Sequence, residues 1–273
     1  MNIDVCNEKI KDELLSRGFS EKTIKTYLTG FKAFYYFLNK ELRYAGKDDF
    51  RNFKLYLIRK RFEPKTINTY LAAALFFYRN IMHRNMSVSG VKLKQKLPDV
   101  LDREFIRQMI DKTENVKHKL LICLMYSSGM RVSEVISMKI EDLDIKKKIC
   151  KVVQGKGRKD RYTILSDMFL ALLDDYKKEY KMLSGYLFPG RKSHLTSRSA
   201  ELVVKGAAEN VDKNKHVHCH TLRHSFATHL AEDGCNLKQI QMLLGHASLR
   251  TTDTYFNMRT DFIRNVRSPG DFH

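Results

Sequence analysis

The feature that most restricts the fold of this chain is a seven-residue segment that occurs twice in its first third. KTIKTYL begins at Lys22 and KTINTYL at Lys65, and six of the seven positions match at an offset of 43 residues. Phe34 and Phe77 match at the same offset. Apolar side chains recur at helical spacing through both copies. The repeat therefore predicts two helical hairpins of similar build.

Signals for helix ends divide this first part into four helices. Gly18 ends the first, Ser20 caps the second, and Pro64 suits the first turn of the fourth. We expect helices at residues 6–17, 20–43, 48–61 and 64–83, with the Tyr and Phe stripes in the core. Four basic side chains point outward, where they could contact a DNA backbone: Lys22, Lys25, Arg59 and Lys65.

From residue 99 onward the periodicity is again mostly helical, with one interruption. The runs ICKVV (149–153) and RYTIL (161–165) are rich in β-branched and aromatic residues and flank the turn-rich QGKGRKD, which predicts a β-hairpin. The expected helices are 101–114, 116–128, 132–139, 167–182, 196–209, 219–233, 236–244 and 249–257. The fold class is therefore mainly α, with a helical domain at 1–83 and a mostly helical domain with a small antiparallel β-hairpin or sheet at 99–273.

The segment between these parts, residues 84–98, loses helical periodicity and is basic. We expect an exposed linker. Its Lys92 and Lys94 could help the two parts close around a polyanion, and an ordinary interdomain connection explains the same sequence equally well.

The formal charge of +19 is spread along the chain, with +8 in residues 1–90 and +11 in the rest. Nucleic acid is the commonest partner for such a charge; a ribosome-associated or merely lysine-rich protein is the alternative. The five scattered cysteines form no CxxC, and the longest apolar run, Tyr70 to Tyr78, is too short to cross a bilayer. The N-terminus lacks the apolar core of a signal peptide. We expect a cytoplasmic protein without a membrane partner.

Four short stretches carry basic residues in patterns suited to an anion. SSGMRVSEV places Arg131 at a helix start, GKGRKD places Lys156 at the hairpin tip, and HTLRHSFATHL presents His220 and Arg223. In that helix an apolar stripe should face the core while imidazole and guanidinium groups face outward. The fourth stretch, LLGHASLRTTDTYF, contains His246 and, nine residues later, Tyr255.

Together these stretches resemble the tyrosine recombinase (phage integrase) family, whose pattern is G-x-R-x-S-E, a hairpin Lys, H-x-x-R, G-H and a nucleophilic Tyr. Each motif alone is weak; the order and spacing of all of them make the signal specific. The resemblance covers the whole chain and implies a SAM-like core-binding domain followed by a catalytic domain. It implies these catalytic residues: Arg131, Lys156, His220, Arg223, His246 and the nucleophile Tyr255.

The chemistry of these residue types fits phosphodiester cleavage. Tyr is a poor nucleophile at neutral pH, and a cationic pocket favours its phenolate. The two guanidiniums can each bind non-bridging oxygens of the phosphorane, His220 and His246 can donate hydrogen bonds or move a proton, and Lys156 can protonate the leaving 5′-oxygen. The resulting 3′-phosphotyrosine conserves bond energy, so that neither ATP nor a metal cofactor is required.

Simpler readings exist for single residues. Arg131 alone could be a surface charge, Lys156 an ordinary turn lysine and Tyr255 a core residue; Glu134, which the resemblance implies orients an Arg, could be a surface carboxylate. Arg158 is a further candidate for DNA contact. The crowding of His and Cys allows a zinc site as an alternative, although the Glu of HExxH is missing. These residues are His216, His218, Cys219, His220 and His224.

The resemblance predicts a site-specific recombinase that binds double-stranded DNA at paired half-sites, as a dimer on one site and a tetramer in the synapse. The two-domain format favours an Xer-like role in resolving chromosome or plasmid dimers. The alternatives are the integrase of a mobile element, a type IB topoisomerase and a non-catalytic DNA-binding regulator. Target site, pathway and any partner recombinase stay open. The tail, residues 258–273, is expected to dock on a neighbouring protomer or, alternatively, on its own domain.

Overall fold

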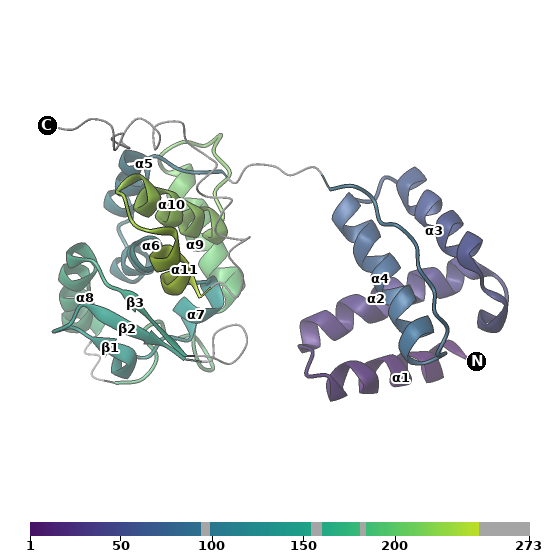
Figure 1. Ribbon diagram of the computed structural model, residues 1–273. Helices are drawn as coiled ribbons and strands as arrows, with labels where there is room; N and C mark the ends of the chain where they lie inside the picture. Colours follow the sequence, from purple (N-terminus) through teal and green to yellow (C-terminus); the bar gives the residue numbers. More distant parts are fainter. Residues whose placement is uncertain (94–98, 154–159, 181–183, 246–273) are drawn as a thin grey trace, which may run out of the picture. The chain divides into compact units, whose positions relative to one another are not determined.

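The computed structural model describes residues 1–93, 99–153, 160–180 and 184–245 (Figure 1). The chain divides into two compact units, Met1–Lys96 and Leu97–His273. In the described parts, no helix is both long enough and apolar enough to cross a membrane.

The first unit is helical, as the repeat predicts. Its elements are α1 (Ile3–Ser16), α2 (Glu21–Leu38), the 3₁₀ helix η1 (Leu42–Tyr44), α3 (Lys47–Arg59) and α4 (Pro64–Asn80). Ser20 caps α2 by accepting the Thr23 N–H, and Pro64 is the first residue of α4. The second helix is shorter than the expected 20–43, because Asn39 takes a left-handed conformation with φ of 44° and ends it.

The two copies of the repeat lie on α2 and α4, which pack directly against each other. The helices approach so closely that a Cβ on Gly30 would lie 2.9 Å from the Cα of Tyr70. The Phe31 and Phe77 rings meet at 4.4 Å between centroids, and both are fully buried. An aromatic core between the hairpins, as predicted, therefore stabilises this unit.

The described part of the basic segment, residues 84–93, lies along the first unit and is not freely exposed. Met86 is buried, and Val91 is held by Asn68, whose side chain accepts the Val91 N–H at 2.7 Å and donates to its carbonyl at 2.9 Å. Lys92 is exposed. The expectation of an exposed linker is thus wrong for the first residues of this segment, because their apolar side chains and backbone find partners on α4.

The second unit combines seven α-helices with a small sheet among its described residues. The helices are α5 (Arg103–Asp111), α6 (Val116–Ser128), α7 (Val132–Ile136), α8 (Asp167–Tyr180), α9 (Ser197–Glu209), α10 (Cys219–Glu232) and α11 (Leu237–Leu244), with the 3₁₀ helix η2 (Ile140–Asp142). The expected helix 132–139 ends at Ile136 and is followed by η2. The expected helix 249–257 and the tail lie outside the described residues.

The sheet is antiparallel with the order β1 (Leu143–Asp144), β2 (Ile149–Val152) and β3 (Arg161–Ile164). The predicted hairpin is present as β2 and β3, with Cys150 opposite Thr163. The two-residue strand β1 was not predicted, because so short a segment carries no periodicity. The sheet lies on the α8 side of the unit (Figure 1).

Helix α6 forms the centre of the second unit. Its residues from Leu120 to Met125 are all buried, and it packs between α8 and α10. Gly129 ends the helix with φ of 61°, and a Cβ there would lie 2.2 Å from the Phe226 ring of α10. Only glycine fits this turn, which leads the chain directly to Arg131 at the start of α7.

Candidate active site

Four of the residues that the family resemblance implies lie in the described parts of the chain: Arg131, Glu134, His220 and Arg223. Lys156, His246 and Tyr255 lie outside the described residues, as do Lys94 and Arg158. The roles of all these residues are therefore expectations from the sequence, and the structure defines the surroundings of the first four.

Arg131 is the N-cap residue of α7 and sits two residues beyond the Gly129 turn. Its side chain is 22% exposed, and its Nη1 donates to Glu134 Oε1 at 2.9 Å. Glu134 also accepts the backbone N–H of Arg131 at 2.8 Å through Oε2. This second bond is half of a capping box, so one carboxylate fixes both the backbone and the side chain of Arg131.

Arg223 is buried in α10 at 3% exposure, which corrects the expectation of an outward cationic face. Its Nη1 donates to the carbonyl of Gly129, and its Nη2 donates to the carbonyl of Leu244 at 2.7 Å. These carbonyls end α6 and α11, and the C-terminal ends of helices attract cations. The guanidinium is thus drawn inward and joins the ends of two helices, one of which is the Gly129 turn that precedes Arg131.

His220 and His224 lie one turn apart on α10. His220 is exposed in the first turn, and its ring centroid lies 6.2 Å from that of the half-buried His224. Burial lowers the pKa of His224, and the charges of His220 and Arg223 lower it further. These effects favour the neutral form of His224, and of the two imidazoles His220 is the more exposed to solvent.

Arg161, the first residue of β3, belongs to the same cluster and was missed by sequence reasoning. Its Nη1 and Nη2 donate to the two carboxylate oxygens of Glu134 at 3.0 and 2.8 Å, and its Nε donates to the Leu243 carbonyl at 3.0 Å. The signal that could have found it is the alternation of RYTIL, in which Arg161 shares the inward face with the buried Thr163.

The charge of Glu134 is maintained by these contacts. Burial raises the pKa of its carboxyl, but the hydrogen bonds from Arg161 and the Arg131 amide, together with both guanidinium charges, outweigh burial and bring the pKa below its ordinary value. The one negative charge of Glu134 is set against the two positive charges of Arg131 and Arg161, so these three side chains together carry a net positive charge. The surface carboxylate that was the alternative for Glu134 is excluded, since its side chain is only 7% exposed.

The first unit displays the basic residues proposed for DNA contact. Lys22, Lys25, Arg59 and Lys65 are all exposed, and Lys22 and Lys65 occupy matching positions in α2 and α4. Because these side chains are exposed, a DNA backbone could reach them without a steric clash. Their part in binding DNA stays a prediction.

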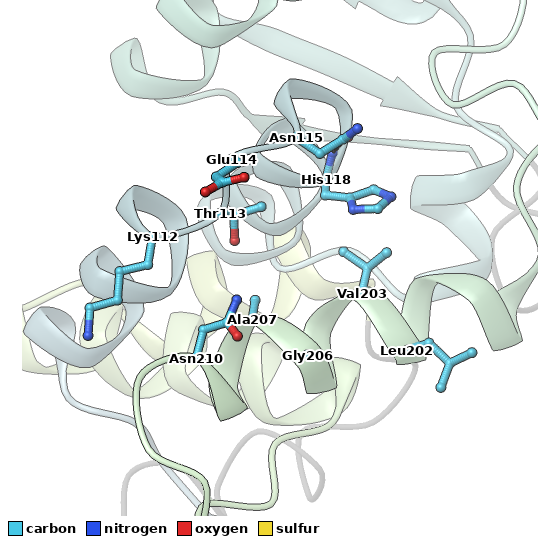
Figure 2. Close-up of a pocket in the computed structure, with 10 residues that line it drawn as sticks. All are labelled: Lys112, Thr113, Glu114, Asn115, His118, Leu202, Val203, Gly206, Ala207 and Asn210. Carbon is cyan, nitrogen blue, oxygen red and sulfur yellow. Dashed lines mark hydrogen bonds between the residues drawn. The ribbon is translucent and has the colours of Figure 1, made fainter.

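A separate cavity of about 540 Å³ lies between the α5–α6 turn and α9. Figure 2 shows Lys112 and Asn210 at one end of it, and His118 and Val203 at the other. Of the expected catalytic residues that the structure describes, none lines this cavity. In the described parts of the chain, no group of three or more His, Cys, Asp or Glu side chains is arranged to hold a metal ion.

The arrangement around Gly129 suits the binding of a phosphate group, including one on which negative charge increases during the reaction. Arg131 and Arg223 are both anchored at this turn, one by a carboxylate and the other by two carbonyls. A guanidinium carries five N–H donors, and the bond from Arg131 to Glu134 uses only some of them, so Arg131 retains donors for an anion. Fixed donors of this kind stabilise charge that develops during phosphoryl transfer.

Comparison with known proteins identifies the family of this chain. Residues 99–261 match the model of the phage integrase family, and residues 7–87 match that of the phage integrase N-terminal SAM-like domain. The chain is 33% identical to a Sinorhizobium fredii protein with the name integrase/recombinase y4qK, over 96% of this chain and 87% of that protein. It is 31% identical to tyrosine recombinase XerA of Pyrococcus horikoshii, over 96% and 94%.

The same likeness extends to a solved structure, the XerH site-specific recombinase bound to its difH substrate before cleavage. It has 26% sequence identity and a TM-score of 0.70 and covers 89% of this chain and 79% of that chain. The mainly helical fold with a small antiparallel sheet is confirmed by these matches. The two matched domains and the relatives, together with the cluster of guanidiniums, show that the chain belongs to the phage integrase family of tyrosine recombinases.

Proposed function

We propose that this protein is a site-specific DNA recombinase that cleaves and rejoins DNA through a 3′-phosphotyrosyl intermediate. The observation that carries the proposal is the pair of guanidiniums fixed at the Gly129 turn, in a chain of the tyrosine recombinase family. A scissile phosphate placed against Arg131 and Arg223 would meet two cations whose positions are set before DNA arrives. Such preorganisation stabilises a transition state because little rearrangement is needed as charge develops.

The remaining roles follow from the order of the motifs. Tyr255 attacks the phosphorus, and the 5′-oxygen leaves with a proton from Lys156. His220 and His246 donate hydrogen bonds to the phosphate or move the proton of Tyr255. The attack of the freed 5′-hydroxyl on the phosphotyrosine of another strand reverses the same steps, and so each bond broken is replaced by one bond formed.

The partner of this reaction is double-stranded DNA. Two duplexes with two half-sites each require four protomers, which gives a dimer on one site and a tetramer in the synapse. The high charge of +19 supports extensive phosphate contact. Because the proposed substrate is DNA, we place the protein in the cytoplasm.

Resolution of chromosome or plasmid dimers is the role we favour, because the relatives named XerA and XerH match nearly the whole chain. Integration of a mobile element is the second candidate, and the integrase/recombinase name of the Sinorhizobium fredii relative favours it. The two roles differ in where the target lies. A target in the chromosome alone supports the first, and a target at the ends of a mobile element supports the second.

The experiment is to capture covalent complexes. The purified chain is incubated with fragmented genomic DNA of its source, the mixture is denatured in SDS, and DNA attached to protein is sequenced. We expect a short inverted repeat with protein at the 3′-phosphate. Adducts at unrelated sequences would favour a topoisomerase, and DNA binding without any adduct would favour a non-catalytic regulator.

A further inference from the structure

Arg161 contributes three side-chain hydrogen bonds to this cluster, two to Glu134 and one to the Leu243 carbonyl. Its side chain is 11% exposed, and it contacts Glu134 with both ends of the guanidinium and the Leu243 carbonyl with Nε. The fork matches both oxygens of the carboxylate, which is the strong bidentate geometry. A residue held by three bonds in this way has one orientation.

The contacts of Arg161 join three segments that each lead to an expected catalytic residue. Through Glu134 it reaches Arg131, whose Nη1 donates to the carboxylate oxygen Oε1 that also receives Nη1 of Arg161. As the first residue of β3, it stands five positions after Lys156 along the chain. Its bond to Leu243 fixes the end of α11, whose last residue, Leu244, stands two positions before His246 in the sequence.

The end of α11 is fitted to this arginine. Gly245 caps the helix with φ of 63°, and a Cβ on it would lie 2.7 Å from Cδ of Arg161. The same helix end supplies the Leu244 carbonyl that holds Arg223 at 2.7 Å. One side chain therefore sets the position of the α11 end, on which a second guanidinium depends.

We propose that Arg161 is a positioning residue for strand cleavage: it fixes Glu134 and the end of α11, and these in turn hold Arg131 and Arg223 at the scissile phosphate. This inference rests on the proposed recombinase function. Arg161 acts through Glu134 and the end of α11, to which its two terminal nitrogens and its Nε donate. Its charge also balances Glu134, so that Glu134 does not neutralise Arg131 alone.

The test separates cleavage from binding. The substrate is the duplex recovered as a covalent adduct with the wild-type protein, and single-turnover cleavage and half-site affinity are both measured. Arg161→Met removes the fork and the charge but keeps an unbranched apolar stem, and Arg161→Lys retains the charge without the fork. The matched control is Arg107→Met on α5, where an exposed arginine pairs with Asp111 at 3.8 Å.

We expect Arg161→Met to bind the duplex within about threefold of the wild type and to cleave it about 100-fold more slowly, the loss that a small misplacement of catalytic groups produces. Arg161→Lys should fall between the two, and Arg107→Met should match the wild type. The double variant Glu134→Gln/Arg161→Met should cleave no more than about threefold more slowly than the slower single variant, because both substitutions release the same guanidinium.

Cleavage by Arg161→Lys at the wild-type rate would overturn the inference, because the fork would then be unnecessary. Losses in the double variant that multiply would also overturn it, since the two residues would act independently. If Arg161→Met does not fold, the single variant Arg161→Lys and the double variant Glu134→Gln/Arg161→Lys decide the question. If the wild-type protein cleaves no duplex, the proposed function is wrong. If the wild type cleaves and the variant rates differ from those expected, only the role of Arg161 is wrong.

Discussion

Replacement of Glu134 by Gln tests how strongly the two guanidiniums depend on one carboxylate. The carboxylate accepts four hydrogen bonds, two from Arg161, one from the Arg131 side chain and one from the Arg131 amide. An amide has the same shape but only one acceptor atom, and its NH₂ group would face guanidinium or backbone donors. The variant therefore loses bonds and leaves two partly buried cations without their counter-charge.

The size of the effect follows from burial. Removal of one partner of a buried ion pair costs about 3–5 kcal/mol. We take the lower end, about 3 kcal/mol, because the Arg131 side chain is 22% exposed and water can partly solvate it. For a unit of this size each kcal/mol shifts the melting temperature by about 2–4 °C, so we expect a fall of about 6–12 °C.

The assay is thermal or urea unfolding of the variant. The control is Glu104→Gln, which changes an exposed carboxyl on α5 that accepts a hydrogen bond from Gln108 and should alter stability by less than about 0.5 kcal/mol. Because the folded-state pKa of Glu134 lies below its ordinary value of 4.5, its contribution is complete above that value and is lost as pH falls through the folded pKa. The difference in the free energy of unfolding between the wild type and Glu134→Gln should be constant from about pH 8 to 6 and should shrink below about pH 4. A loss under about 1 kcal/mol at pH 7 would refute the reasoning.

Two further predictions concern the leaving group and the turn. Lys156→Ala should slow cleavage of normal DNA but cleave a substrate with sulfur at the 5′-bridging position, since that leaving group needs no proton; Arg223→Ala should not be rescued, and equal rescue of both would remove Lys156 as the acid. Gly129→Ala should destabilise the protein by about 2 kcal/mol or more, because the new Cβ meets the Phe226 ring at a positive φ. The matched control, Gly206→Ala in α9, meets nothing within 4 Å and should stabilise by about 0.5–1 kcal/mol; equal effects in unfolding experiments would contradict this account.

Local patterns in the sequence predicted most of the elements but not all of their ends. Ser20 and Pro64 mark helix starts because they satisfy or avoid backbone donors within one turn. The end of α2 was placed too late because its apolar run continues past Asn39, and only the left-handed conformation of that residue stops the helix. Strand β1 has two residues and depends on pairing with β2, which no local pattern contains.

The candidate site was predictable in its residue types and only partly in its geometry. The motifs identified Arg131 and Arg223, but helical periodicity placed Arg223 on an outward face. Its burial depends on carbonyls from α6 and α11, which lie 94 and 21 residues away in the chain. Arg161 was missed for the same reason, since its partner Glu134 is 27 residues distant and belongs to another element. Polar contacts between elements are set by tertiary packing, and the sequence alone does not encode them in a short pattern.

The most direct test of the central claim is to measure whether Tyr255→Phe still forms a covalent adduct with DNA. The substitution removes one oxygen and little volume, so the variant should bind the target duplex with wild-type affinity. The wild-type protein should form an SDS-stable adduct whose peptide map contains the DNA on Tyr255, and the Phe variant should form none. An adduct of undiminished yield with Tyr255→Phe would show that another residue is the nucleophile and would contradict the account.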